Sequence, residues 1–369
     1  MVKRFRLVCT AAALVPLTLL AAACSSSSST PAASKSSPAA AAAANASGTS
    51  ITETGSTILF PLFGAWQTAY STANPKVTIT SGATGSGTGI TDAGEDLVNI
   101  GASDAPLSAS DLAKYPGLLN IPLTVAAIMV NYNLPGVKSL NLSGKVLAEI
   151  YTGKITTWND AAIAALNPGA TLPSAKIVTL HRADSSGATF QFGSYLNAQD
   201  PGLWPAADIG TTITWPSVPG AVAETGNGGM VTGCAGIKDC IAYIGNSYEA
   251  KTTAAGLGQA SVANKAGKYT TATPAAISAA LASFPAVPAA GAEQLINTSA
   301  PTGYPIINYE YAVVKKTQPS ATEASAIKAF LSWILTTGDT SKYLSATYGT
   351  AVPSATLSVS QKLVSSLSG

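Results

Sequence analysis

The stretch Thr179-Leu-His-Arg-Ala-Asp-Ser-Ser-Gly-Ala-Thr-Phe190 carries the strongest structural signal in the chain. The apolar run Ile177-Val-Thr-Leu180 predicts a buried strand, and apolar residues at 190, 192, 195 and 196 predict a helix after a polar turn. The N-terminus of a helix offers free N–H groups and a positive dipole end, and Arg182 adds a guanidinium. We therefore expect an oxyanion site here. The alternative is a plain helix cap beside a local Arg182–Asp184 ion pair.

Three similar strand–turn–helix units precede this stretch. Each has a turn rich in Gly, Ser or Thr, and the last turn ends its strand on Asp104; the three segments are Thr54-Gly-Ser-Thr-Ile-Leu-Phe-Pro61, Ser81-Gly-Ala-Thr-Gly-Ser-Gly-Thr-Gly-Ile90 and Val98-Asn-Ile-Gly-Ala-Ser-Asp-Ala-Pro106. A glycine-rich turn lets backbone N–H groups approach a ligand, but the Gly-Lys-Ser/Thr of a nucleotide loop is absent from this one. In open α/β folds ligands bind where such strand ends converge. Asp104 is either a ligand residue or a cap for a helix over 107–114.

Apolar periodicity predicts further elements along the chain. We expect strands over 77–80, 125–130, 242–245 and 304–314, and helices over 91–97, 145–151, 161–166, 275–284 and 322–335. Residues 62, 63, 66 and 70 share one face of another expected helix. The Pro/Gly-rich segment 205–225 is predicted to be a loop.

The composition excludes several function classes. The 369 residues allow one large or two ordinary domains, and charged residues make up 10% against ~25% in an average soluble protein. A nucleic-acid binder needs a basic surface, which so few charged residues do not provide. One histidine, His181, and four cysteines leave few ligands for a zinc site. Without the three basic residues of the first 23, the formal charge of +2 becomes about −1. Anion affinity must then come from local geometry.

The N-terminus has the pattern of an export signal. Residues 1–23 join a basic segment to an apolar run that ends Ala-Ala-Ala-Cys24 before five serines. This resembles a bacterial lipobox, in which the cysteine thiol takes a lipid, although Ala21 stands where Leu is usual. An ordinary signal with a chance cysteine stays open. We expect an exported protein, lipid-anchored on the outer face of the cell membrane. The Ser/Ala/Pro-rich 24–48 predicts a disordered tether, with folding from near Thr49.

Two cysteines remain close together in the exported part. Cys234 and Cys240 are separated by five residues in Gly233-Cys-Ala-Gly-Ile-Lys-Asp-Cys240. A metal pair would need further ligands nearby, and the sequence offers none. Export therefore favours a disulfide across a turn.

The order and spacing of these motifs resemble the phosphate-binding protein of bacterial ABC phosphate importers, the PstS family. The resemblance spans about 52–369, and it is carried by Gly55-Ser-Thr-x-x-Phe-Pro61, Thr84-Gly-Ser-Gly-x-Gly89, Ile100-Gly-Ala-Ser-Asp-Ala-Pro-Leu-Ser108, His181-Arg-Ala-Asp-Ser-Ser-Gly187, Ile150-Tyr-Thr-Gly-Lys-Ile-x-x-Trp-Asn-Asp160 and Tyr304-Pro-Ile-Ile-Asn308. With its cysteine pair and Gly226-Asn-Gly-Gly-Met230, the chain is most similar to actinobacterial lipoproteins.

The resemblance implies an α/β fold of the two-lobed periplasmic-binding-protein class, type II, with the ligand in the cleft. Lobe I would comprise 49–128 plus 303–369, and lobe II 129–302, with hinge closure between them. The implied protein is a monomer that captures inorganic phosphate and delivers it to a membrane-embedded ABC permease. It would need no cofactor or metal, perform no catalysis and bind no nucleic acid.

The resemblance also implies roles for individual residues. Phosphate keeps at least one P–O–H at neutral pH and sulfate has none, so a buried carboxylate accepts from one and repels the other. Asp104 takes that role, and Asp184 orients Arg182. The remaining residues that match ligand-binding positions are Ser56, Thr57, Ile58, Ser86, Arg182, Ser186, Gly187 and Ala188. Many family members have Thr in place of Ala188, so only its backbone N–H is available here.

Other protein classes stay open as alternatives. A binding protein for a sulfate-like oxyanion would lack the discrimination by Asp104. An exported phosphatase would need a nucleophile with a base, or metal ligands, and the sequence shows neither a serine elbow nor an acid-rich cluster. A structural surface protein would show no saturable ion binding.

Overall fold

The computed structural model describes residues 48–369, and Gly48–Gly369 form one compact unit. The expected signal, the lipid-attachment residue Cys24 and the tether lie outside the described residues. No helix within 48–369 is both long enough and apolar enough to cross a membrane.

Strands and helices alternate through most of the described part. The strands are β1 (Thr49–Gly55), β2 (Val77–Thr80), β3 (Ile100–Ser103), β4 (Leu118–Tyr132), β5 (Asn141–Leu142), β6 (Val178–Arg182), β7 (Val222–Glu224), β8 (Cys240–Gly245), β9 (Gly258–Gln259), β10 (Ser261–Ala263), β11 (Tyr269–Thr270) and β12 (Ile307–Lys315). The α-helices are α2 (Phe60–Ala73), α3 (Ser86–Gly94), α4 (Ala109–Lys114), α5 (Gly144–Tyr151), α6 (Ala161–Leu166), α7 (Gly187–Gln199), α8 (Gly226–Gly236), α9 (Glu249–Ala254), α10 (Pro274–Leu281), α11 (Ala321–Trp333), α12 (Ser341–Leu344) and α13 (Ser354–Ser365).

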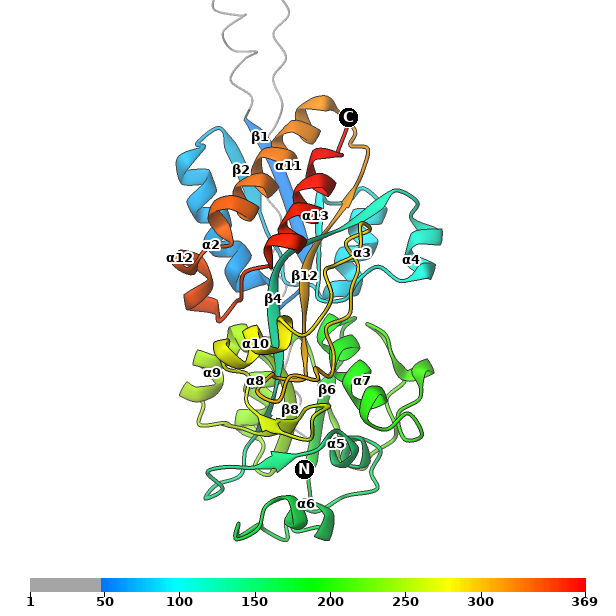
Figure 1. The fold of residues 1–369 in the computed structure, drawn as a ribbon, viewed down its shortest axis with the longest axis vertical. Coiled ribbons are helices and arrows are strands. Elements are labelled where there is room, and N and C mark those ends of the chain that lie inside the picture. Colours follow the sequence, from blue (N-terminus) through cyan, green and yellow to red (C-terminus); the bar gives the residue numbers. More distant parts are fainter. Residues whose placement is uncertain (1–47) are drawn as a thin grey trace, which may run out of the picture. The chain divides into compact units, whose positions relative to one another are not determined.

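One long sheet runs through the described part, in the strand order β2-β1-β3-β12-β4-β8-β6-β7, with β9 paired to β4. β1 lies parallel to both β2 and β3, whereas β12 lies antiparallel to β3 and β4. The long strands β4 and β12 run side by side through the middle of the molecule, as Figure 1 shows. They connect the half that holds β1 to β3 with the half that holds β6 to β8.

Two apolar cores flank these central strands. In the first, Leu62, Phe63, Trp66 and Tyr70 of α2 are buried, which confirms the face predicted from their spacing. Phe63 packs edge-on against Phe330 of α11, with ring centroids 5.6 Å apart. Burial of side chains of this size contributes about 2 kcal/mol each.

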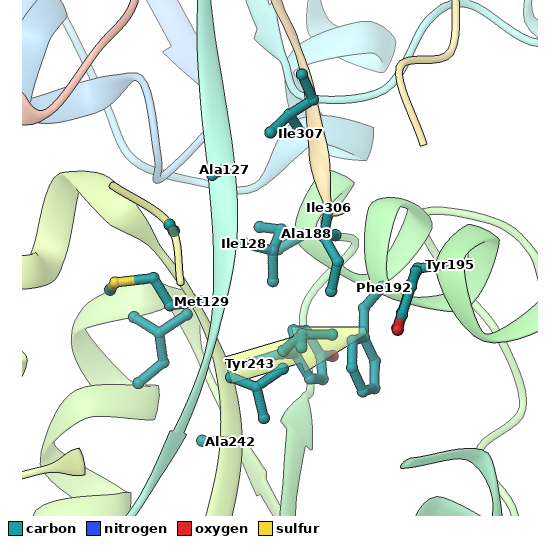
Figure 2. Packing of buried hydrophobic residues seen from close by; sticks show 14 of the residues in the cluster. Ala127, Ile128, Met129, Ala188, Phe192, Tyr195, Ala242, Tyr243, Ile306 and Ile307 are labelled. Carbon is teal, nitrogen blue, oxygen red and sulfur yellow. The ribbon is translucent and has the colours of Figure 1, made fainter. Parts of the chain in front are cut away.

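The second core fixes the position of α7. Phe192 of α7 stacks on Tyr243 of β8, with ring centroids 4.7 Å apart and planes 11° from parallel. One turn earlier, Ala188 is fully buried in the same cluster as Ile128 and Ile306 (Figure 2). The first turn of α7 is therefore held against the central strands.

Most predicted elements are confirmed, with shifted ends in several cases. β2 and α6 have the predicted bounds, whereas β4 is longer and α11 is slightly shorter than expected. The helix expected over 91–97 begins earlier, at Ser86, because Gly85 with φ of 100° lets the chain turn directly into it. Segment 205–225 is not wholly a loop, because β7 pairs with β6 there. That pairing depends on tertiary contacts, which local propensity does not encode.

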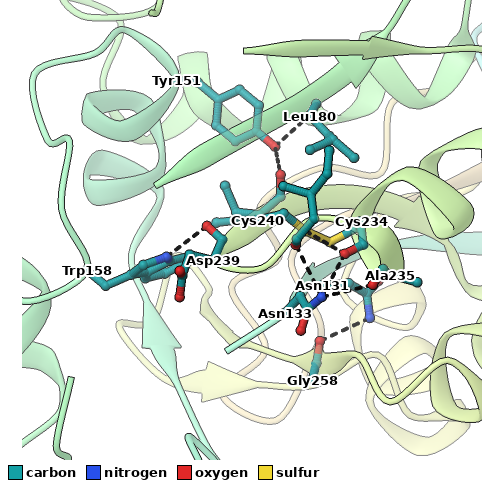
Figure 3. Close-up of a disulfide and its surroundings, with 12 residues drawn as sticks. Asn131, Asn133, Tyr151, Trp158, Leu180, Cys234, Ala235, Asp239, Cys240 and Gly258 are labelled. Carbon is teal, nitrogen blue, oxygen red and sulfur yellow. Dashed lines mark hydrogen bonds between the residues drawn. A yellow bond between two sulfur atoms is a disulfide. The ribbon is translucent and has the colours of Figure 1, made fainter. Parts of the chain in front are cut away.

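The expected disulfide is present. It joins Cys234 of α8 to Cys240 at the start of β8, with the two Cα atoms 5.6 Å apart. Asn133 donates from its amide nitrogen to the carbonyls of Cys234, Ala235 and Ile237, so the turn is also held by hydrogen bonds (Figure 3).

Candidate anion site

Three of the predicted site residues meet where the ends of several elements converge. Gly187 begins α7, Ser86 begins α3 and Asp104 follows β3. A Cβ atom placed on Gly187 would lie 2.6 Å from the Cβ of Asp104 and 2.7 Å from the Oγ of Ser86. Position 187 therefore tolerates only glycine. Ser86 and Asp104, which lie more than 80 residues before Gly187 in the sequence, form one buried polar cluster with it.

Asp104 is held by its backbone and is 1% exposed. Its N–H donates to Ser86 Oγ at 3.1 Å, and its carbonyl accepts from the amides of Gln191 and Asn308. The alternative role as a helix cap is excluded, because Ser108 caps α4 by accepting from Asp111 N–H. The Asp104 carboxyl therefore does not cap α4.

A second carboxyl, which the sequence reading missed, lies beside Asp104. Glu310 is fully buried in β12, and its Oε2 lies 3.1 Å from Ser56 Oγ. Ser56 Oγ also contacts Oδ1 of Asp104 and accepts from the N–H groups of Ile58 and Leu59. The signal that could have found Glu310 is its isolation as an acid within the otherwise apolar 304–314 strand.

Burial dominates the electrostatics of the two carboxyls. It raises the pKa of Asp104, and hydrogen bonds from Glu310 and Ser56 with the charge of Arg182 offset part of that rise. For Glu310, burial and then the neighbouring Asp104 charge raise the pKa well above its usual range. Burial and mutual contact therefore disfavour a state in which both carboxyls are ionised.

Arg182 occupies the opposite side of the site, at the end of β6. Its guanidinium donates from Nε to Asp184 Oδ1 at 2.7 Å and from Nη2 to Asp184 Oδ2. Nη1 is buried and has no partner among residues 48–369. Burial would raise the pKa of Asp184, but the bonds and charge of Arg182 and the N–H of Gly226 outweigh it and lower that pKa. Asp184 stays ionised and holds the Arg182 guanidinium in one orientation.

The start of α7 provides the helix N-terminus expected next to Arg182. Ser186 is the N-cap, and its Oγ accepts from Thr189 N–H at 3.4 Å. The first N–H groups of a helix, here including those of Gly187 and Ala188, have no carbonyl partner within the helix. The cap interpretation and the anion interpretation thus apply to the same turn.

Two other predicted residues use their polar groups within the protein. The Thr57 hydroxyl accepts from both the backbone and the side-chain amide of Asn227, the latter at 2.7 Å. The Ile58 N–H donates to Ser56, and its carbonyl accepts from Ser247. Asn227, within the Gly226-Asn-Gly-Gly run, was not singled out as a site residue, yet it ties α8 to the start of α2.

His181 has a structural environment. Its ring packs on Trp215 with centroids 4.8 Å apart, and burial lowers its pKa, so it is neutral near pH 7. It borders a cavity of about 320 Å³ that Arg182, Asp184 and Trp215 also line. Within 48–369 no group of three or more His, Cys, Asp or Glu side chains could hold a metal ion.

Comparisons with known proteins give one consistent picture. A family model described as a PBP superfamily domain matches residues 39–337. The phosphate-binding protein PstS of Xylella fastidiosa is 30% identical over 291 residues, which cover 78% of each chain. PstS of Methanocaldococcus jannaschii is 33% identical over 81% of each chain. PstS3 of Mycobacterium bovis is 30% identical over 76% of this chain and 77% of its own.

Solved structures confirm the fold class. A high-affinity periplasmic phosphate-binding protein, PfluDING, bound with phosphate, aligns with a TM-score of 0.69 and 21% identity, over 85% of this chain and 93% of its own. A putative phosphate ABC transporter substrate-binding protein from Clostridium perfringens aligns with a TM-score of 0.60 and 20% identity, over 82% of this chain and all of its own. The α/β, two-lobed periplasmic-binding fold of type II is thereby established.

Proposed function

Because the chain belongs to the PstS family of phosphate-binding proteins, we propose that it captures inorganic phosphate outside the cytoplasm and delivers it to an ABC-type import permease. The relatives named above are binding proteins rather than enzymes, and no catalytic step is part of the proposal.

The observation that carries the proposal is the buried Nη1 of Arg182, which has no partner within 48–369. The rest of that guanidinium is fixed by Asp184, so one N–H face is preorganised and desolvated. A buried donor of this kind costs about 1–3 kcal/mol if it stays unpaired. A phosphate oxygen would satisfy it.

The other groups would replace the hydration shell of the ion with neutral dipoles. The candidates are the Ser86 hydroxyl and the first N–H groups of α7 at Gly187 and Ala188. Such donors offset the cost of removing an anion from water without adding net charge. Ser56 contributes indirectly, because its hydroxyl is committed to the two carboxyls.

Asp104 would supply selectivity. Its Oδ2 faces the start of α7, since the Gly187 Cβ position lies 2.8 Å from it. A carboxylate there accepts from the P–O–H of phosphate and repels the bare oxygens of sulfate. The alternative is a binding protein for a sulfate-like oxyanion, and the experiment must therefore include sulfate.

The proposal has finer parts that follow from the family. Lobe I would comprise 49–128 plus 303–369 and lobe II 129–302, joined through β4 and β12 and closing around the ion. The protein would act as a monomer, held on the outer face of the cell membrane through a lipid on Cys24. The actinobacterial subtype stays a prediction, because the Xylella, Methanocaldococcus and Mycobacterium relatives are similarly close.

One titration tests the proposal. Isothermal titration with inorganic phosphate should show saturable one-site binding, with a Kd of about 1 μM or tighter, equivalent to roughly −8 kcal/mol. Sulfate at the same concentrations should neither bind nor displace phosphate. Equal binding of the two ions would identify a general oxyanion protein, and an absence of binding to either would refute the proposal.

A further inference from the structure

Glu310 has no role in the phosphate-binding scheme described so far, although it lies next to Ser56 and Asp104 of the site. It is 0% exposed, and none of the ion pairs found within 48–369 involves it. Its Oε2 contacts Ser56 Oγ, which also contacts Asp104, and its Oε1 has no partner among the described residues. Two acidic side chains thus meet at one hydroxyl group.

The surroundings offer no positive charge to Glu310. Arg182 acts on Asp104 from the end of β6 but is itself neutralised by Asp184, and the titratable groups on either side of Glu310 along β12 are Tyr309 and Tyr311. The other side of Glu310 lines a small cavity whose remaining walls, including Thr124 of β4 and Ser247, are uncharged. Two buried carboxylates in contact cannot both stay ionised in such a site.

We propose that Asp104 and Glu310 act as one acid pair that holds a single proton, that Glu310 is the protonated member, and that anion binding depends on that proton. The inference rests on the proposed function for the identity of the anion. Glu310 is a positioning residue, because it acts through Ser56 and Asp104. With its proton, the pair carries one negative charge; without it, the pair would present two charges to an incoming anion.

The geometry explains what the proton achieves. Asp104 Oδ1 is engaged by Ser56, and Oδ2 faces the first turn of α7. A neutral Glu310 lets the Ser56 hydroxyl donate to Asp104, which holds that carboxylate with Oδ2 toward the ligand. An ionised Glu310 would compete for the same hydroxyl proton and repel Asp104. The raised pKa of Glu310, caused by burial and by Asp104, supports this arrangement at neutral pH.

The test compares pH profiles of phosphate affinity for the full chain and two variants. Glu310→Gln keeps a neutral side chain of the same shape, and Glu53→Gln is a matched control, since Glu53 is also buried but contacts none of the site residues named here. Titrations with inorganic phosphate run from pH 6 to pH 10. The wild type and Glu53→Gln should lose affinity in parallel at alkaline pH, by about tenfold per pH unit above the ionisation of the pair. Between pH 6 and pH 10, the fold-loss of phosphate affinity should be at least ten times smaller for Glu310→Gln than for the wild type. Parallel profiles for all three proteins would overturn the inference.

A second readout separates this inference from the phosphate assignment. Without phosphate, the melting temperature of Glu310→Gln should rise relative to the wild type as the pH increases. Only the wild type has a buried acid whose ionisation at high pH destabilises the folded state. If the wild type fails to bind phosphate but this difference grows, the proposed function fails and the acid pair stands. A constant difference would refute the pair whatever the wild type binds. A Glu310→Gln protein that cannot fold at pH 7 would refute it also, since Gln imitates the protonated acid.

Discussion

The two sides of the site affect the pKa of an aspartate in opposite directions. At the end of β6, Asp184 accepts two hydrogen bonds from Arg182 and one from Gly226, and these interactions lower its pKa. After β3, Asp104 has a second acid, Glu310, as its neighbour, and burial raises the pKa of both. The same type of side chain is thus a paired anion on one side and, in our proposal, half of a proton-holding pair on the other.

The difference separates affinity from selectivity. The Arg182–Asp184 side has zero net charge and one free donor, so it can attract any oxyanion. In our proposal the Asp104–Glu310 side carries one negative charge, and neither acid forms an ion pair within 48–369, so this side would accept only a ligand that brings its own proton. Each side can be altered by a substitution of its own, and the predictions below do so, beginning with the largest expected effect.

Arg182→Ala should cause the largest loss, because it removes the free donor and leaves Asp184 as an uncompensated, half-buried charge. Phosphate affinity should fall by more than about 2 kcal/mol, or roughly 30-fold. Isothermal titration measures the loss, and Lys114→Ala serves as the control, since Lys114 lies on the surface in α4. A loss of less than about threefold would show that the guanidinium is structural and that the comparison between the two sides is wrong.

Asp104→Asn should change selectivity more than affinity. The amide can donate to a bare oxygen, so sulfate should compete about tenfold better than it does with the wild type, the scale of one charged hydrogen bond. Competition titrations of phosphate-loaded protein with sulfate give the number. Asp111→Asn, in the exposed capping box of α4, is the matched control. Unchanged sulfate competition would move the discriminating role away from Asp104.

The two sides also differ in how much of them the sequence revealed. Arg182, Asp184 and the start of α7 are contiguous in the chain, so local pattern was enough to predict a strand, a polar turn and a helix with an anion-binding end. Resemblance then placed Asp104 and Ser86 beside them, and the contacts of Gly187 agree with that placement.

Glu310 could not be found in this way. It lies 254 residues from Ser56, and the periodicity of 304–314 predicts only that this segment is a strand. The link between Thr57 and Asn227, 170 residues apart, was missed for the same reason. Pairings of this kind depend on the register of distant elements, which local periodicity does not determine. A lone acid in a buried strand is the one sequence signal that remains.

Glu53→Gln should have the smallest effect on phosphate binding, and it tests whether burial alone accounts for the raised pKa values of the carboxyls. Glu53 is 4% exposed in β1, and burial raises its pKa from 4.5 to about 8 against a smaller, opposing interaction with the backbone of Gly82. The folded state therefore binds more protons than the unfolded state between these two values. The stability linked to Glu53 is fully present below pH 4.5 and is lost as the pH rises through 8.

The variant carries no such charge, so its free energy of unfolding should exceed that of the wild type by several kcal/mol at pH 9, at about 1.4 kcal/mol for each pH unit between the two pKa values, and by nothing at pH 4, after allowance for its own buried amide. Urea unfolding at both pH values measures this, with the exposed Glu95→Gln as control. Phosphate affinity should be unchanged, because Glu53 shares no hydroxyl with Asp104. Should Glu53→Gln instead flatten the pH profile of phosphate binding, the proton that matters would not belong to the Asp104–Glu310 side, and burial in general would explain both carboxyls.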